Sequence, residues 1–368
     1  MFIPRIFLGA PSLFFCYNAP HMNTLELEAI AKQLVRSGRG ILAADESTTS
    51  ANKRFAAVGV EEIEENRRVY RQILLTTPEA SHTLSGVIFY DETFWQLSDE
   101  GKPFHQMVAD VGILPGIKVD EGLIDFPGFP GEKLTKGLDA LPQRMEKYRD
   151  AGAKFAKWRA VITIAATTPS DEAITANAFI LARYARICQD YDIVPIVEPE
   201  VLFDGTHTAK RCEEVMNQVY EALVLALRTY RVHLPGAILK SSMVLPGKES
   251  GEPVLADDVS LRTVRALHTY IPEEMGGVVF LSGGQTPSQA FLNLNAIAQK
   301  GPHPWGLTFS YSRGLQDPVL KYWAEHRDDV AGAKAIFARQ LAIAVQSSLG
   351  QLHAEELGGD FVSGSQDL

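Results

Sequence analysis

The feature that most constrains the fold is an alternation of short apolar runs with amphipathic helical stretches. It begins near Leu25 and continues through most of the chain. Each apolar run is rich in Val, Ile, Phe or Ala and is bounded by Gly, Pro or polar residues, as strands are. The eight expected strands are 40–46, 85–92, 114–120, 154–162, 193–202, 236–243, 277–284 and 306–312. The main expected helices are 61–75, 137–151, 171–191, 208–230, 261–271 and 288–299.

Strands that alternate with helices pair in parallel through right-handed crossovers. Eight such units within 368 residues favour a closed (β/α)8 barrel, or TIM barrel, over an open doubly wound sheet. No Gly-x-Gly-x-x-Gly follows the first strand and no Walker-type phosphate loop is present, which argues against nucleotide-binding folds. No linker divides the chain, so we expect one α/β catalytic domain over 22–356, with additional peripheral helices.

The two ends of the chain differ from this pattern. Residues 1–21 are apolar, with Arg5 as their only formal charge, and Gly and Pro interrupt them too often for a membrane span. We interpret 1–21 as a disordered extension or a mis-assigned start before Met22, with an organellar transit peptide as the alternative. Residues 357–368 are rich in Gly, Ser and Asp, and we expect a flexible tail there.

Composition excludes several classes of partner. The formal net charge of −10 argues against a nucleic-acid or a membrane-surface partner, so an anionic ligand requires a local positive cluster. The cysteines, Cys16, Cys188 and Cys212, show no CxxC spacing, which fits a reducing, cytoplasmic compartment without disulfides or a zinc site. The charge-dense segment 62–71 is typical of a solvated helix face.

Lys240 is the most informative single residue. It lies among apolar residues late in the expected strand 236–243, where an ammonium group is costly unless it is paired or neutral. A lysine in its neutral form is a nucleophile that forms a Schiff base with a carbonyl. The alternative is a strand-end lysine that extends into water. Other strands repeat the anomaly, which favours the chemical interpretation.

Strand residues two apart share a face, and the carboxyl ends of barrel strands meet at one mouth. By this spacing Lys157 shares a face with Arg159, Glu198 with Glu200, and Lys118 with Asp120. We therefore expect one pocket that holds Lys118, Lys157, Arg159 and Lys240 against Asp45, Glu198 and Glu200. Buried structural ion pairs are the alternative, but such pairs stabilise a barrel less well than apolar packing.

This pocket suits imine chemistry. Several cations around Lys240 favour its free amine, and Glu198 or Glu200 can shuttle the protons that carbinolamine formation and dehydration require. No cofactor and no metal are needed, because the iminium itself is the electron sink.

Two loops are candidate anion sites. After the seventh strand, Ser282, Gly283 and Gly284 precede a helix, and the eighth strand ends in Ser310 and Arg313. Phosphate sites after strands seven and eight recur in barrels, where glycines and helix N-termini present N–H groups. A second candidate follows Asp45 and comprises Ser47, Ser50, Lys53 and Arg54. A helix N-cap with a basic first turn explains this second segment equally well.

Seven strings in order resemble the class I fructose-1,6-bisphosphate aldolases. They are Gly40-Ile-Leu-Ala-Ala-Asp45-Glu-Ser47, Gly116-Ile-Lys118-Val-Asp120, Phe155-Ala-Lys157-Trp-Arg159, Pro195-Ile-Val-Glu198-Pro-Glu200, Leu239-Lys240-Ser-Ser-Met243, Leu281-Ser-Gly-Gly-Gln285 and Leu307-Thr-Phe-Ser310-Tyr-Ser-Arg313. The resemblance runs from Met22 to about Gly350. It implies a glycolytic and gluconeogenic lyase that cleaves fructose 1,6-bisphosphate reversibly into dihydroxyacetone phosphate and glyceraldehyde 3-phosphate.

The resemblance also implies roles. Lys240 is similar to the Schiff-base lysine and Glu198 to the proton shuttle, with Glu200 tuning its charge. Asp45 resembles the carboxylate that takes the hydroxyl proton during cleavage. Lys157 resembles the charged partner near the scissile bond. Lys118 and Arg159 resemble substrate-positioning cations, the two loops resemble the phosphate sites, and a homotetramer is implied.

Two departures affect substrate preference more than reaction type. Animal members of the family end in a tyrosine that reaches the site, whereas this chain ends in Leu368 and Phe361 is the only aromatic residue of its tail. Ser312 stands where the family often has glycine beside the phosphate, and because the backbone N–H is retained we expect binding to survive.

Three other functions stay open at this point. A Schiff-base aldolase or transaldolase for another sugar phosphate would prefer fructose 1-phosphate or sedoheptulose 1,7-bisphosphate. A non-catalytic scaffold would bind ligand without turnover. A metal-dependent aldolase would lose activity in chelator, although the nine histidines show no ligand spacing.

Overall fold

Eight parallel strands close into a barrel in the order β1-β10-β9-β8-β7-β6-β3-β2 in the computed structural model, which describes residues 22–357. The strands are β1 (Gly40–Ala44), β2 (Leu84–Phe89), β3 (Leu114–Lys118), β6 (Phe155–Ile162), β7 (Val194–Val201), β8 (Ile238–Ser241), β9 (Gly277–Phe280) and β10 (Leu307–Tyr311). All eight expected strands are therefore confirmed. The expected extension 1–21 lies outside the described residues, as does the expected tail 357–368, with Phe361, apart from its first residue. Leu357 is buried at the end of a 3₁₀ turn.

The observed strands end earlier than several of the expected ones. β1 ends at Ala44 and β9 at Phe280, whereas the expected strands continue to residues 46 and 284. At these points the chain leaves the ladder and turns toward the mouth of the barrel. The extra residues therefore belong to the loops that build the site.

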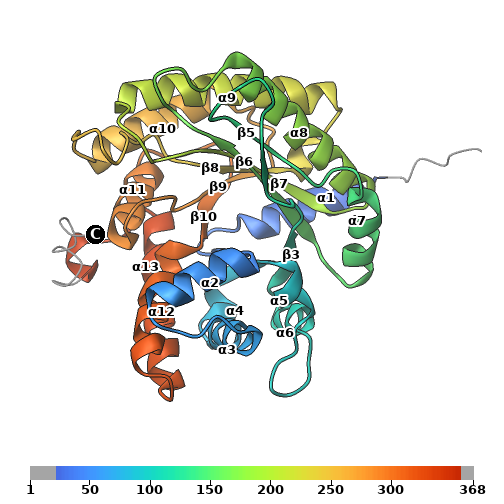
Figure 1. The fold of residues 1–368 in the computed structure, drawn as a ribbon, viewed down its shortest axis with the longest axis vertical. Helices are drawn as coiled ribbons and strands as arrows, with labels where there is room; N and C mark the ends of the chain where they lie inside the picture. Colours follow the sequence, from blue (N-terminus) through green and yellow to red (C-terminus); the bar gives the residue numbers. More distant parts are fainter. Residues whose placement is uncertain (1–21, 358–368) are drawn as a thin grey trace, which may run out of the picture.

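Helices surround the barrel, with α8, α9 and α10 on one side and α3, α12 and α13 on the opposite side (Figure 1). Six helices match the expected ones: α3 (Glu64–Leu75), α7 (Leu141–Asp150), α8 (Asp171–Asp190), α9 (Ala209–Thr229), α10 (Ala256–Tyr270) and α11 (Pro287–Gln299). The others include α1 (Thr24–Leu34), α2 (Thr48–Ala57), α4 (Ala80–Thr83), α5 (Asp91–Trp95), α6 (Phe104–Asp110), α12 (Arg313–Glu325) and α13 (Val330–Ser348). Short 3₁₀ turns occupy Leu234–Gly236 and Ala354–Leu357.

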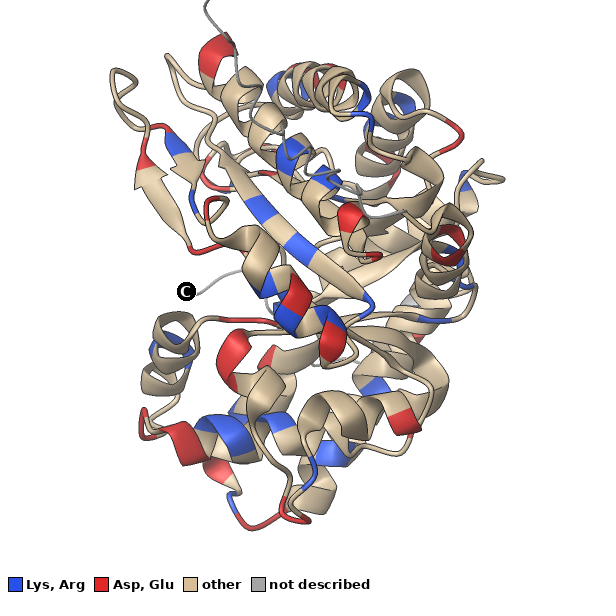
Figure 2. Ribbon diagram, turned by 90° about the vertical axis from the view of Figure 1, so that its right-hand side faces the viewer, with Lys and Arg blue, Asp and Glu red and all other residues tan. Residues whose placement is uncertain are grey.

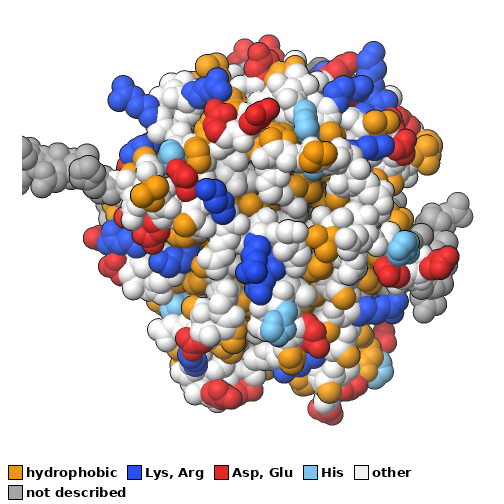
Figure 3. Space-filling model, turned by 180° about the vertical axis from the view of Figure 1, so that it is seen from behind, with side chains coloured by type: hydrophobic (Ala, Val, Ile, Leu, Met, Phe, Trp, Pro, Cys, Tyr) orange, Lys and Arg blue, Asp and Glu red, His pale blue; other side chains and the backbone are white. Residues whose placement is uncertain are grey.

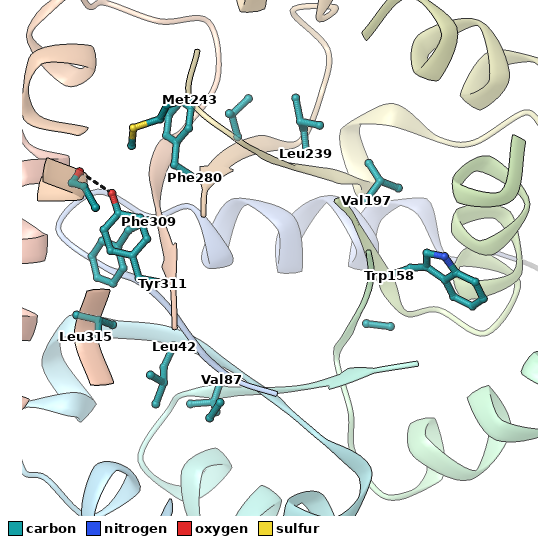
Figure 4. Close-up of a cluster of buried hydrophobic side chains, with 14 of the residues drawn as sticks. Leu42, Val87, Trp158, Val197, Leu239, Met243, Phe280, Phe309, Tyr311 and Leu315 are labelled. Atoms are coloured by element: carbon teal, nitrogen blue, oxygen red, sulfur yellow. Dashed lines mark hydrogen bonds between the residues drawn. The ribbon is translucent and has the colours of Figure 1, made fainter. Parts of the chain in front are cut away.

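The outer core lies between the strands and the helices. Leu42, Trp158, Phe280 and Tyr311 are fully buried on the outward side of their strands (Figure 4). The Tyr311 hydroxyl donates a hydrogen bond of 2.9 Å to the Ala290 carbonyl of α11, so its polar atom is satisfied inside this layer.

The inner core fills the lower barrel, near the amino ends of the strands. It consists of inward residues such as Ile41, Phe155, Ile196, Ile238 and Val279. Helix α1 closes this end, and its buried residues Leu27, Ile30, Ala31 and Leu34 join the same cluster. Gly116 makes room for this packing, because a Cβ atom there would lie 2.3 Å from the Phe155 ring.

A two-stranded hairpin beside the mouth was not expected. It pairs β4 (Leu123–Asp125) with β5 (Lys133–Thr135) in antiparallel fashion. The sequence does not predict these strands, because each has only three residues, too few to show an alternation of apolar and polar side chains.

The outer surface mixes charge types. Lys and Arg are interspersed with Asp and Glu over the helices (Figure 2), and apolar side chains on the far face are scattered among charged ones (Figure 3). Within residues 22–357, no helix has the length and apolarity that crossing a membrane requires.

Candidate active site

The site continues the inner columns of the barrel toward the carboxyl ends of the strands. On β6, Phe155 fills the lower interior, and Lys157 and Arg159 follow on the same side of the strand. On β7, Glu198 and Glu200 follow Ile196 in the same way. The period of two in a strand thus puts these charges directly above the apolar plug.

A cavity of about 820 Å³ opens at this end of the barrel. It brings together nearly every predicted site residue: Asp45, Ser47, Ser50, Lys53, Arg54, Lys118, Lys157, Arg159, Glu198, Glu200, Lys240, Ser282, Gly283, Ser310 and Arg313. The exception is Gly284, which does not line the cavity. Its Cα faces Phe203, whose ring would lie 2.9 Å from an added Cβ atom.

Lys157 occupies the centre of the charge cluster. Its Nζ lies 2.6 Å from Asp45 Oδ2 and 3.0 Å from Glu198 Oε2. The other oxygen of Glu198, Oε1, lies 3.2 Å from Nζ of Lys240. Glu198 is therefore a carboxylate shared by two lysines, and all four side chains are buried.

The ion pairs keep these groups charged despite their burial. Burial alone raises the pKa of a carboxyl group, but Lys157 and Lys240 outweigh it, and the pKa of Asp45 falls well below its ordinary value of 3.8. The same balance, with Arg159 contributing, holds the pKa of Glu198 below 4.5. Burial lowers the pKa of Lys157, but Asp45 and Glu198 raise it above 10.5. Asp45, Lys157 and Glu198 are thus ionised at neutral pH.

The remaining strand charges form a second row. Arg159 pairs with Glu200, and Lys118 Nζ lies 2.7 Å from Asp120 Oδ1. Asp120 Oδ2 also accepts a 3.4 Å hydrogen bond from the Arg159 backbone N–H. Asp120 was not assigned to the site from the sequence, although the expected strand 114–120 puts it on the same face as Lys118, and that spacing was the signal that could have found it. In the structure it lies just beyond β3.

The loops after β9 and β10 join at one side of the cavity. Gly283 has φ of +57°, a left-handed conformation that favours glycine. Arg313 donates a hydrogen bond to its carbonyl, and the Gly314 N–H donates one of 3.4 Å to Ser282 Oγ. Ser310 Oγ is buried against the cavity and has no hydrogen-bond partner among the described residues. A hydroxyl left in this state is available to a ligand.

The loop after β1 combines the two interpretations that the sequence left open. Ser47 caps α2, because its Oγ accepts a hydrogen bond from the Ser50 N–H at 3.3 Å. The same segment, with Lys53 and Arg54, also lines the cavity. A helix N-cap and an anion site are therefore compatible here.

Glu46 and Arg71 are two residues that sequence reasoning missed. Glu46 follows Asp45 and forms ion pairs with Arg54 and Arg71. Arg71 is 3% exposed, so the solvated helix face expected for 62–71 is wrong at this position. No sequence signal marks Arg71, because its partner lies on a distant element and only the fold brings the two together.

Comparisons with known proteins show the family of this chain. The family model for fructose-bisphosphate aldolase class-I matches residues 26–364. Fructose-bisphosphate aldolase 4, cytosolic, of Arabidopsis thaliana is 46% identical over 345 residues, which cover 94% of this chain and 88% of the relative. The fructose-bisphosphate aldolase, non-muscle type, of Lethenteron camtschaticum is 48% identical over 320 residues, or 86% of this chain and 88% of the relative.

A solved structure is also similar. It is fructose-bisphosphate aldolase from Plasmodium falciparum in a ternary complex with TRAP and a small-molecule inhibitor. The TM-score is 0.88 at 43% identity, over 90% of this chain and 96% of that chain. This chain therefore belongs to the class I fructose-bisphosphate aldolase family, lyases that cleave fructose 1,6-bisphosphate reversibly through a lysine Schiff base.

Proposed function

We propose that Lys240 forms the Schiff base through which this chain cleaves fructose 1,6-bisphosphate into dihydroxyacetone phosphate and glyceraldehyde 3-phosphate. The observation that carries this assignment is the position of Lys240 Nζ, 3.2 Å from Glu198 Oε1 inside the mouth of the barrel. A buried amine beside a carboxylate has a route for the proton that it must lose before it attacks a ketone.

Glu198 is proposed as the proton shuttle of imine formation. Transfer of a proton from Lys240 to Glu198 frees the amine, which attacks the ketone carbon and gives a carbinolamine. The transfer also removes one of the cations that hold the pKa of Glu198 down, so this pKa rises. The protonated Glu198 can then act as the general acid that releases water and leaves the iminium.

Asp45 is proposed as the base for cleavage. It takes the proton of the hydroxyl next to the scissile C–C bond, the bond breaks, and its electron pair flows into the iminium to give an enamine. The aldehyde product leaves, and protonation and hydrolysis of the enamine then release dihydroxyacetone phosphate. Lys157, at 2.6 Å from Asp45, keeps this carboxylate ionised and ready to accept the proton.

The two loop regions are proposed as the phosphate sites. Ser282, Gly283, Ser310 and Arg313 would hold one phosphate through hydroxyl, N–H and guanidinium groups. Ser47, Ser50, Lys53 and Arg54 would hold the other, and Lys118, Arg159 and Glu200 would position the sugar chain between them. Gly284, also expected from the sequence to bind substrate, follows Gly283 but does not line the cavity, so it is left out of this phosphate site.

Borohydride trapping tests the assignment. The protein is incubated with dihydroxyacetone phosphate, reduced, digested and mapped by mass spectrometry. We expect an adduct on Lys240 that disappears in Lys240→Met. A matched control is Lys154→Met, because Lys154 precedes the same barrel strand as Lys157 but pairs at the surface with Glu26 at 3.4 Å. An adduct on Lys118 or Lys157 would overturn the assignment.

We also propose that residues 22–356 form the catalytic unit, that four copies assemble, and that the protein is cytoplasmic. Exposed Leu225 and Leu261, on α9 and α10, offer apolar surface for assembly. Two relatives from Arabidopsis thaliana carry the word cytosolic in their names. A sedimentation mass close to one 40.4 kDa chain would contradict the tetramer.

A further inference from the structure

Glu46 is an unusually crowded acceptor at the edge of the active-site cavity. Its Oε1 receives hydrogen bonds from Arg54, from Ser312 Oγ at 2.7 Å and from Gln316 Nε2 at 3.1 Å. Its Oε2 receives one from Arg71. Burial raises the pKa of Glu46, but Arg71 and Arg54 outweigh it and lower the pKa below 4.5. Glu46 is thus a fixed negative charge, and three donors converge on its Oε1 atom.

Arg54 is held by two carboxylates in this structure. Besides Glu46, its Nη2 donates a 2.8 Å hydrogen bond to Asp317 Oδ1. The two carboxylates engage two of the three guanidinium nitrogens and fix the orientation of the group at the cavity wall, so turning it toward a phosphate loosens its contact with Glu46 or Asp317. The free-energy cost of that step depends on what remains on Glu46 Oε1 after Arg54 leaves.

Ser312 supplies the hydrogen-bond donor that remains on Glu46 Oε1 when Arg54 leaves. It stands at the N-cap position of α12, where a serine usually accepts a hydrogen bond from the first helical turn. Its side chain makes no such cap and donates to Glu46 instead. Gln316 lies one turn further along α12, and its Nε2 donates to the Ala43 carbonyl at 2.8 Å. The same nitrogen lies 3.1 Å from both Ser312 Oγ and Glu46 Oε1, which share its second N–H. The hydroxyl is therefore held on the same oxygen that Arg54 uses.

We propose that Ser312 is a positioning residue that lowers the cost of moving Arg54 from Glu46 to a substrate phosphate. The inference rests on the proposed role of Arg54 in phosphate binding. When Arg54 turns away, the Ser312 hydroxyl keeps Glu46 Oε1 hydrogen-bonded, so this largely buried oxygen is not left without a donor. A residue without a side-chain hydroxyl at this position makes Glu46 depend more strongly on Arg54.

Kinetics in the direction of condensation test this role, because each triose phosphate brings one phosphate. Ser312→Ala and Ser312→Gly both remove the hydroxyl and should behave alike. We expect KM to rise by about three- to tenfold for only one of the two triose phosphates, with the effect on KM rather than on kcat. Asp317→Asn loosens the other restraint on Arg54 and should lower the same KM.

A double-mutant cycle separates this role from direct phosphate binding by Ser312. In an Arg54→Met background, Ser312→Ala should change that KM no further, since the group through which Ser312 acts is gone. An equal effect of Ser312→Ala with and without Arg54, or an equal rise of both KM values, would overturn the inference. Borohydride trapping on Lys240 in each variant keeps the outcomes distinct. Adducts in all variants with an additive cycle would refute this inference alone, whereas no adduct in the unaltered protein would refute the proposed function.

Discussion

The lower and upper halves of the barrel interior are built by the same strands from opposite kinds of side chain. On β6 the inward residues change from Phe155 to Lys157 and Arg159, and on β8 from Ile238 to Lys240. The lower half packs against α1 and contains apolar side chains. The upper half contains the shared pairs Asp45–Lys157–Glu198–Lys240.

The difference separates what stabilises the barrel from what makes it an enzyme. Apolar side chains gain free energy when they leave water, whereas a buried ion pair gains little beyond the cost of removing its charges from water. The lower half therefore carries the stability. The upper half supplies the chemistry and depends on the lower half for its fold. Substitutions in the two halves should therefore differ in their effects on unfolding free energy and on catalytic activity.

The largest effect is expected from Lys157→Met. The substitution leaves the carboxylates of Asp45 and Glu198 buried without the cation that they share, so the pKa of each should rise. We expect catalytic activity per folded molecule to fall by at least about a hundredfold, and the free energy of unfolding to fall by about 3–5 kcal/mol. Single-turnover kinetics and urea unfolding measure the two effects.

A quadruple variant serves as the control for that loss of stability. Asp45→Leu, Lys157→Met, Glu198→Leu and Lys240→Met together extend the lower half upward and leave none of these four charges without its partner. The variant should be inactive yet recover most of the stability that Lys157→Met loses. A quadruple variant less stable than the single one would show that the charges themselves hold the barrel together.

The next largest effect is expected from Phe155→Ala in the lower half, where stability rather than activity should be lost. Phe155 is fully buried between strands and α1, and its ring fills the space that Gly116 leaves open. Removing it should cost about 3–5 kcal/mol of unfolding free energy through lost burial and a cavity. Activity per folded molecule should change by less than about threefold at a temperature where the variant is folded. A large loss of kcat in folded protein would mean that the two halves are not separable.

Much of this division was predictable from the sequence. Period-two spacing put Lys157 with Arg159 and Glu198 with Glu200, and the eight apolar runs specified the barrel that brings them to one mouth. Both inferences depend on local patterns that a strand imposes on its own residues.

Contacts between elements were not predictable. Nothing in the sequence near α1 shows that it closes the barrel, and nothing near Arg71 shows that it reaches Glu46. The expected strand 277–284 extended past Phe280 for a related reason, since local sequence does not mark where pairing with the neighbouring strands stops.

The dependence of the unfolding free energy on acid pH should also distinguish the two halves, with a smaller effect. The folded-state pKa of Asp45 and of Glu198 lies below the ordinary values of 3.8 and 4.5, so each contributes stability that is fully present above those values. That stability is lost as pH falls through the folded-state pKa. Asp45→Asn should therefore flatten the acid limb of unfolding free energy against pH, whereas a lower-half variant such as Ile238→Val should shift the whole curve without changing its slope. An unchanged acid limb in Asp45→Asn would contradict the assigned pKa direction.

The smallest effect is expected at Ser310, where the two halves meet. Its Oγ is buried at the cavity wall and has no partner among the described residues, so the folded protein gains little from it. Ser310→Ala should change the unfolding free energy by less than about 1 kcal/mol. We expect a slight increase in stability, because the substitution removes a buried polar atom that has no hydrogen-bond partner in the described structure. If Ser310 donates to a phosphate, KM for fructose 1,6-bisphosphate should rise by about two- to fivefold. Urea unfolding and steady-state kinetics on one preparation give both numbers. A loss of stability with an unchanged KM would mean that Ser310 belongs to the packed lower half. An unchanged stability with a raised KM would mean that it belongs to the functional upper half.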